Sequence, residues 1–112
     1  MNIKGLGVDV IEIQRFRSLL KKNKKHFFER VFSRLERDYC MSYTDSAPHF
    51  AGTFAAKEAV QKTLSKAIGL EEIEIRRDTK GKPHVWLKGR RSRILVSISH
   101  SLLTACATAI RQ

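Results

Sequence analysis

Two carboxylates occupy positions where apolar residues would be expected, and they are the side chains best placed to do chemistry. Asp9 interrupts the apolar run of residues 3–13, and Glu58 falls at helical spacing on the same face as apolar residues of the segment 51–55. A carboxylate among apolar neighbours is costly to desolvate unless a cation or a donor meets it. Two such groups converging from rigid elements would suit magnesium, which takes one or two protein carboxylates with waters and substrate phosphates.

Each carboxylate also has an ordinary structural explanation. Asp9 would be a hydrogen-bonded residue at the end of a strand, and Glu58 would pair with Lys62 four residues later on the helix. Spacing alone favours these explanations, since two carboxylates far apart in sequence are a weak signal. If magnesium does bind, Lys57, Lys62 and Lys82 would meet its phosphate ligands as compact charges.

A histidine near the C-terminus is the remaining candidate for chemistry. His100 lies in the segment Ser97-Ile-Ser-His-Ser101, between two predicted strands. His100 would contact a phosphate or carry a proton if it is functional. Otherwise it is a turn residue whose ring nitrogens are hydrogen-bonded within the protein. The sequence has no Gly-x-Ser-x-Gly, no Walker loop and no dinucleotide fingerprint, which argues against the common kinases and hydrolases.

The charge balance predicts an anionic partner. The formal net charge is +11 over 112 residues. Basic residues gather within 21–25, at helical spacing within 30–37, and within 90–93. Nucleic acid is the default partner for such a composition, while an acidic protein or a phosphate-rich small molecule fits equally well. Any one cluster is explained as readily by a solvated basic face.

The hydrophobic patterns and turn residues predict an α+β fold in a single domain, residues 1–112. Strands are expected at 3–13, 72–77, 84–87, 94–99 and 102–110, and helices at 14–22, 26–32, 34–41 and from 46 to just before Gly69. Ser33 would cap the third helix, with Glu36 completing a capping box. Gly5 and Gly7 indicate a close backbone approach in the first strand. The result is an antiparallel sheet packed against one long helix, with short N-terminal helices.

Two features of the sequence predict a cytoplasmic protein. No apolar run is long enough to span a bilayer, and Asp9 and Glu12 interrupt the run that a signal sequence would need. Cys40 and Cys106 lie far apart in apolar segments and are expected to be reduced core residues. The histidines and cysteines do not show zinc-site spacing.

Five short segments follow one another in order along nearly the whole chain. They are Gly7-Val-Asp9 with Glu12-Ile-Gln-Arg-Phe16, Phe32-Ser-Arg-Leu-Glu36, Phe54-Ala-Ala-Lys-Glu-Ala59 followed by Lys62, Gly81-Lys-Pro83, and Ser97-Ile-Ser-His100. Together they resemble the motifs of the holo-[acyl-carrier-protein] synthase family, and the third segment is the most diagnostic. One motif alone would be unconvincing, whereas five in order within one short domain are not expected by chance.

The resemblance implies a 4'-phosphopantetheinyl transferase, which moves the phosphopantetheine arm of coenzyme A onto a serine of apo acyl carrier protein and releases adenosine 3',5'-bisphosphate. By motif match, Asp9 and Glu58 would be catalytic and would hold Mg²⁺ against the coenzyme A pyrophosphate. The residues implied to contact coenzyme A are Lys57, Lys62, Lys82, Pro83 and His100. The proton of the carrier serine would go to a water in the metal shell or to a site carboxylate, and the sequence does not decide between them.

The resemblance also gives the positive charge a specific explanation. Acyl carrier proteins are small, acidic and helical, and charge complementarity mainly raises the association rate and selects partners. The residues implied to dock this partner lie on the first helix and are Arg15, Arg17, Lys21 and Lys22. Members of the family typically form homotrimers with active sites between subunits, and they serve fatty acid biosynthesis.

The chain departs from the family pattern at two places that bear on coenzyme A. Thr53 stands where members often carry an arginine, and Ser65-Lys-Ala67 replaces a Gly-Thr-Gly-like turn. Two other functions fit the sequence: a basic nucleic-acid-binding module, and a carrier-binding protein that lacks catalysis. The first is disfavoured because few aromatic residues accompany the basic ones, and the second because Asp9 and Glu58 are intact.

Overall fold

The computed structural model describes residues 2–112. The first half of the chain contains β1 (Gly5–Glu12), α1 (Ile13–Lys21), α2 (Lys25–Val31), α3 (Arg34–Met41) and α4 (Ala47–Thr63). The second half contains the 3₁₀ helix η1 (Leu70–Glu72) and the strands β2 (Ile73–Arg77), β3 (Pro83–Leu87), β4 (Arg90–Arg91), β5 (Leu95–His100) and β6 (Thr104–Arg111). The predicted α+β class, the antiparallel pairing and the long helix are confirmed.

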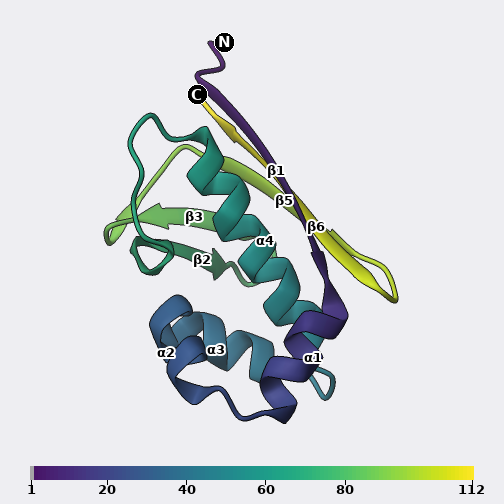
Figure 1. Ribbon diagram of the computed structural model, residues 1–112. Helices are drawn as coiled ribbons and strands as arrows, with labels where there is room; N and C mark the ends of the chain where they lie inside the picture. The colour runs from purple at the N-terminus through teal and green to yellow at the C-terminus, as the bar shows by residue number, and fades with distance from the viewer. Residues whose placement is uncertain (1) are drawn as a thin grey trace.

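The strands form two antiparallel sheets of three strands, where the sequence suggested one. The first sheet has the order β1-β6-β5 and the second has the order β2-β3-β4. Figure 1 shows α4 lying across the first sheet, with β2 and β3 on its other flank and α1, α2 and α3 gathered around its N-terminal end. The two chain ends meet at one end of the first sheet, because β1 and β6 pair along their whole length.

Small residues allow α4 to approach the first sheet closely. Ala105, Ala107 and Ala109 of β6 are at most 1% exposed and belong to the same core cluster as the alanines of α4. A side chain at Gly7 of β1 would overlap the carbonyl of Ala59, and one at Gly5 would overlap the carbonyl of Thr63. The close approach predicted for these two glycines is therefore confirmed, and α4 is its other partner.

The outer face of the first sheet has the opposite character. Side chains alternate along β1, so that Gly5, Gly7, Asp9 and Ile11 face α4 while the intervening residues are exposed. Three of those outward residues are large and apolar: Leu6, Val8 and Val10 are 70%, 54% and 60% exposed.

The helices α1–α3 close the molecule around an aromatic cluster. Phe16 of α1 packs against the rings of Phe28, Phe32 and Phe54, with ring centroids 5.5–6.2 Å apart. The predicted capping box of α3 is present, since Ser33 Oγ accepts from the Glu36 amide and Glu36 Oε1 accepts from the Ser33 amide.

The end of α4 differs from the prediction. The helix stops at Thr63 and not just before Gly69, because Leu64 turns to an extended conformation. Arg111 of β6 donates from Nε to the Thr63 carbonyl at 2.7 Å, which satisfies one of the carbonyls that a helix end leaves unpaired. Gly69 instead precedes η1. No helix within residues 2–112 is long and apolar enough to cross a membrane.

Candidate active site beside helix α4

Asp9 lies on the face of β1 that α4 covers, and its carboxylate is only partly satisfied. The side chain is 17% exposed. One oxygen, Oδ1, is 3.4 Å from Lys62 Nζ. The other oxygen, Oδ2, is buried and has no hydrogen-bond partner among the described residues. A buried carboxylate oxygen without a donor is costly, and a cation or a donor from outside the chain would satisfy it.

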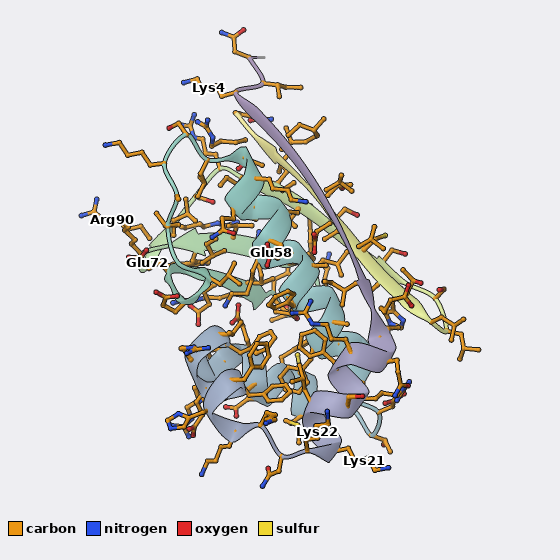
Figure 2. All side chains as sticks on the ribbon, in the orientation of Figure 1. Lys4, Lys21, Lys22, Glu58, Glu72 and Arg90 are labelled. Atoms are coloured by element: carbon orange, nitrogen blue, oxygen red, sulfur yellow. The ribbon has the colours of Figure 1, made fainter. Side chains whose placement is uncertain are left out.

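Glu58 and Lys62 lie one turn apart on the side of α4 that faces β1. Lys62 Nζ donates to the carbonyl of Val8 at 2.8 Å and to Asp9, and not to Glu58 as the helical spacing suggested. Glu58 is half-buried midway along α4 (Figure 2), and its carboxylate makes no hydrogen bond or ion pair within residues 2–112. Asp9 of β1 therefore pairs with Lys62 of α4, and Glu58 lies one helical turn before Lys62.

Lys57, which the family resemblance implies as a coenzyme A contact, lies in the protein core. Its side chain is 1% exposed, and its Nζ donates to Glu36 Oε1 at 2.7 Å and to the carbonyl of Val31 at 2.6 Å. Successive helix residues are turned by about 100°, so Lys57 points toward α3 while Glu58 points toward β1. An ammonium group held in this way is not available to a phosphate, and we assign Lys57 to the core.

Glu36, which resembles a family residue without an assigned role, is the partner that explains Lys57. Besides Lys57 and the Ser33 amide, it accepts from the Ile75 amide of β2 at 2.8 Å. Burial raises the pKa of Glu36 and lowers the pKa of Lys57, while each charge opposes the shift of the other. The pair joins α3, α4 and β2, because both carboxylate oxygens of Glu36 and the ammonium of Lys57 form hydrogen bonds.

The remaining motif residues lie on β5, at the edge of the first sheet opposite β1, and at the start of β3 in the second sheet. His100 is the last residue of β5, which is separated from β1 by β6. Pro83 begins β3 and pairs with Arg77 of β2, and Lys82 is exposed in the turn before it. In the first sheet β6 therefore lies between the strand that carries Asp9 and the strand that carries His100.

The basic residues of α1 are placed for an external partner, with one exception. Lys21 and Lys22 are exposed at the end of α1 farthest from the sheets (Figure 2). Arg15 is exposed with its guanidinium 5.1 Å from the centre of the Phe54 ring. Arg17 forms a two-bond ion pair with Asp45, at 2.7 and 3.0 Å, so its charge is largely compensated.

The donor set fits a hard cation that brings its own further ligands. Asp9 and Glu58 supply oxygen ligands, and the unpaired Asp9 Oδ2 is the atom that such an ion would satisfy. No group of three histidine, cysteine or acidic side chains that could hold a metal occurs within residues 2–112. Two carboxylates match magnesium, which retains waters and substrate oxygens, better than a metal that needs a complete protein cage.

Comparison with known proteins identifies the family. The sequence pattern of the 4'-phosphopantetheinyl transferase superfamily matches residues 5–110. The chain belongs to this superfamily. It is 39% identical to the holo-[acyl-carrier-protein] synthase of Chlamydia caviae, over 98% of both proteins, and 37% identical to that of Thermodesulfovibrio yellowstonii, over 96% of this chain and 97% of the relative.

Solved structures agree with the sequence relatives. The Bacillus anthracis holo-(acyl-carrier-protein) synthase in complex with CoA (3',5'-ADP) has a TM-score of 0.79 and 35% identity, covering 96% of this chain and 95% of that one. The Neisseria meningitidis holo-[acyl-carrier-protein] synthase has a TM-score of 0.84 and 26% identity over 99% of both chains. The protein is thus a 4'-phosphopantetheinyl transferase in fold and in sequence along its described length.

Several residues near His100 were not identified from the sequence. The His49 ring lies 5.6 Å from the His100 ring and stacks on Tyr43 at 3.5 Å, while the Arg77 guanidinium lies 4.4 Å from the centre of the Tyr39 ring. These residues come from three separate segments. No spacing rule connects such residues, so only the fold brings them together.

Proposed function

We propose that the protein transfers the 4'-phosphopantetheine arm of coenzyme A to a serine of apo acyl carrier protein, with magnesium, and releases adenosine 3',5'-bisphosphate. The observation that carries the proposal is the arrangement of Asp9, Glu58 and Lys62, which match the family motif and leave a buried Asp9 oxygen without a donor. The carrier serine oxygen attacks the phosphorus that bears the pantetheine arm, and its proton passes to a water or to a site carboxylate. The bond from that phosphorus to the bridging oxygen breaks, and the nucleotide leaves with the second phosphate.

The residues of this chain hold the reactants for that step. Asp9 and Glu58 would bind magnesium, which when bound supplies positive charge at the pyrophosphate. Lys62 already donates to Asp9 and Val8, and its ammonium retains a third donor for a phosphate oxygen. The main contribution of such a site is to position the serine in line with the bond that breaks.

We also propose that the working enzyme is a homotrimer. The Asp9 edge and the His100 edge of one chain lie on opposite sides of α4, so one copy's first edge would meet another copy's second edge. The exposed apolar side chains of Leu6, Val8 and Val10 offer a surface that association would cover. Sedimentation analysis of Val8→Lys tests this idea: the variant should become monomeric and inactive, and an unchanged assembly would contradict it.

The acidic carrier would dock on α1. Lys21, Lys22 and Arg15 provide the free charge, and charge of this kind mainly raises the association rate. Figure 2 shows Lys4 and Arg90 at the opposite end of the molecule from Lys21 and Lys22. Both cysteines are free thiols, which agrees with a reaction in the cytoplasm.

The test is direct transfer. The purified protein is incubated with coenzyme A, Mg²⁺ and an apo acyl carrier protein, and the carrier is weighed by mass spectrometry. A gain of one phosphopantetheine is expected, and EDTA should abolish it. Glu58→Gln should lose the gain, while Glu12→Gln, which removes an exposed carboxylate from the end of β1, should keep it. No transfer to any of several carriers, beside a working control enzyme, would overturn the proposal.

A further inference from the structure

A cavity lies where the loop after α4 meets the turn between β3 and β4 (Figure 1). Its volume is about 390 Å³, within the range of about 300–1,000 Å³ typical of small-molecule sites. Its lining includes neither Asp9, Glu58 and Lys62 nor the motif residues of β3 and β5. The transfer reaction as proposed therefore does not use this cavity.

Hydrogen bonds hold both walls of the cavity in place. Gln61 of α4 donates from Nε2 to the Ile68 carbonyl at 2.6 Å, which fixes the loop. On the other wall, Lys88 and Gly89 have φ of 48° and 80°, as in the two-residue turns that join twisted antiparallel strands. The Lys88 amide donates to the Glu72 carbonyl at 2.8 Å, which ties this turn to the end of the loop. Walls formed before a ligand arrives lower the ordering cost of binding.

The apolar part of the lining is aliphatic. Leu64, Ile68 and Leu87 are half-buried and pack against the core, so part of each side chain stays exposed to the cavity. The lining contains no aromatic ring on which a nucleobase could stack. Ser65 is its one uncharged polar side chain, which offers too few directional partners for a sugar. These walls suit a flexible aliphatic chain.

The charged part of the lining is entirely basic. Its members are Lys66, Lys88, Arg90 and Arg111, with no carboxylate. The charged groups of the first three are exposed and form no hydrogen bond or ion pair within residues 2–112. Arg111 is partly engaged by the Thr63 carbonyl, and the nearby Glu72 carboxylate accepts from the Gly69 amide at 3.1 Å. In Figure 2, Arg90 extends outward from the molecule. Because such side chains lay apolar stems along a surface and keep their charge in water, they place positive charge at the entrance.

We propose that this cavity binds a single aliphatic chain with an anionic headgroup, the chemistry of a long-chain carboxylate. Burial of methylene groups against the aliphatic walls supplies affinity, and the basic entrance selects a negative headgroup over a positive one. The inference goes beyond the proposed transfer, which does not require this site. Ser65 and Lys66 belong to the segment that replaces the Gly-Thr-Gly-like turn of the family, so coenzyme A is the competitor to exclude.

Isothermal titration calorimetry with dodecanoate, below its micellar concentration, tests the inference. One saturable site is expected. Decanoate should bind about fifteenfold more weakly, because each buried methylene group contributes about fourfold in affinity. Dodecyltrimethylammonium has the same chain and the opposite charge, and it should not bind. Equal binding of the two twelve-carbon amphiphiles would overturn the inference, since exposed apolar surface alone would explain it.

Two matched variants test the basic entrance. Lys88→Glu places a carboxylate at the cavity and should weaken dodecanoate binding by about tenfold, because an attraction becomes a repulsion. Lys80→Glu makes the same change of charge at an exposed position in the turn before β3, outside the cavity lining. Screening by salt should keep its affinity within about twofold of the wild type. Equal losses in the two variants would assign the effect to overall charge and overturn the inference.

Methyl NMR spectra locate the bound chain. The signals of Ile68 and Leu87 should shift in a saturable manner. A smaller cavity of about 170 Å³, lined in part by Leu20 and Met41, combines apolar and basic residues and serves as an internal comparison. Shifts at Leu20 and Met41, or at the outward-facing Val8, in place of those at Ile68 and Leu87 would overturn the inference.

Competition with coenzyme A separates this site from the transfer site. Saturating coenzyme A should leave the affinity for dodecanoate unchanged, and displacement of dodecanoate would assign the cavity to the transfer reaction and overturn the inference. The titration follows binding and not transfer, so its result does not depend on whether the proposed function holds.

Discussion

The consecutive residues Lys57 and Glu58 of helix α4 lie in opposite environments. Lys57 points to the side of α3 and β2, where its ammonium and the Glu36 carboxylate are fully buried and satisfied. Glu58 lies one helical turn before Lys62, which bonds to Val8 and Asp9 of β1. Within residues 2–112 the Glu58 carboxylate makes no hydrogen bond or ion pair, and the buried Asp9 Oδ2 has no donor. The first side uses buried charge to join three elements, whereas the second leaves polar atoms free for a ligand. A buried charge with all its hydrogen bonds, as at Lys57 and Glu36, thus indicates a structural role. Carboxylate oxygens that lack donors indicate the candidate site.

The largest expected effect is on the satisfied side. Lys57→Met leaves the Glu36 carboxylate buried without its cation and should lower the free energy of unfolding by about 3–5 kcal/mol. Urea denaturation measures this loss. The double variant Lys57→Met with Glu36→Gln should recover part of it, because the amide is neutral and its one oxygen still accepts from one of the two backbone N–H groups.

Lys62→Met makes the same chemical change on the other side of the helix and serves as the matched control. Lys62 is 52% exposed, so its removal should change the unfolding free energy by no more than about 0.5 kcal/mol. If Lys57→Met and Lys62→Met lowered the free energy of unfolding equally, the two lysines would not differ in their structural role.

The next effect is on catalysis. Asp9→Asn removes a proposed metal ligand and should lower the transfer rate by about a hundredfold or more, since a bound metal supplies several kcal/mol at the reacting phosphate. Thermal unfolding should change little, because Asp9 Oδ2 has no donor to lose. If the unfolding temperature fell while the rate stayed the same, Asp9 would belong with the structural residues.

A smaller effect is expected where β1 meets α4. Gly7→Ala adds a methyl group that overlaps the Ala59 carbonyl, so the strand must shift and about 1–3 kcal/mol of stability should be lost. The shift moves Asp9, so transfer should weaken as well. Val8→Ala, on the outward face of the same strand, is the control, with both stabilities measured in the monomer. A similar loss of unfolding free energy in both variants would argue against the close approach of β1 to α4.

The smallest effect concerns the thiols and leaves activity unchanged. Burial raises the pKa of Cys40 to about 12, so it carries almost no reactive thiolate at pH 8. A disulfide reagent should label at most Cys106, and Cys40 should react only after unfolding. Because the Cys40 pKa is raised in the folded state, its contribution to stability is complete below its ordinary pKa and declines as pH rises toward 12. Rapid labelling of both thiols in the native protein would contradict this.

The sequence predicted local structure and motif position well because both depend on nearby residues. The capping box at Ser33, the close approach at Gly7 and the order of the elements follow from short-range patterns. The side to which a residue points is different. Lys57 and Glu58 differ by one residue, and only the placement of α3 and β1 decides that one is core and the other is site.

Two further differences have the same origin. The early end of α4 depends on Leu64 turning to an extended conformation, and Arg111 at the far end of the chain meets the last carbonyl. The grouping of His49, Arg77 and His100 depends on three separate segments meeting. Such long-range contacts leave no periodic signal in a single sequence.

The pairing of β1 with β6 bears on how the protein is made. Gly5 lies opposite Arg111, so the strand that carries Asp9 obtains its hydrogen-bonded neighbour from a strand that is made long after it. Contacts this distant in sequence form late and slowly. A nascent chain that still lacks its final strand therefore has its helices and its motifs but no completed sheet to hold Asp9 against α4. Activity should therefore begin only after β6 has been made and has paired with β1.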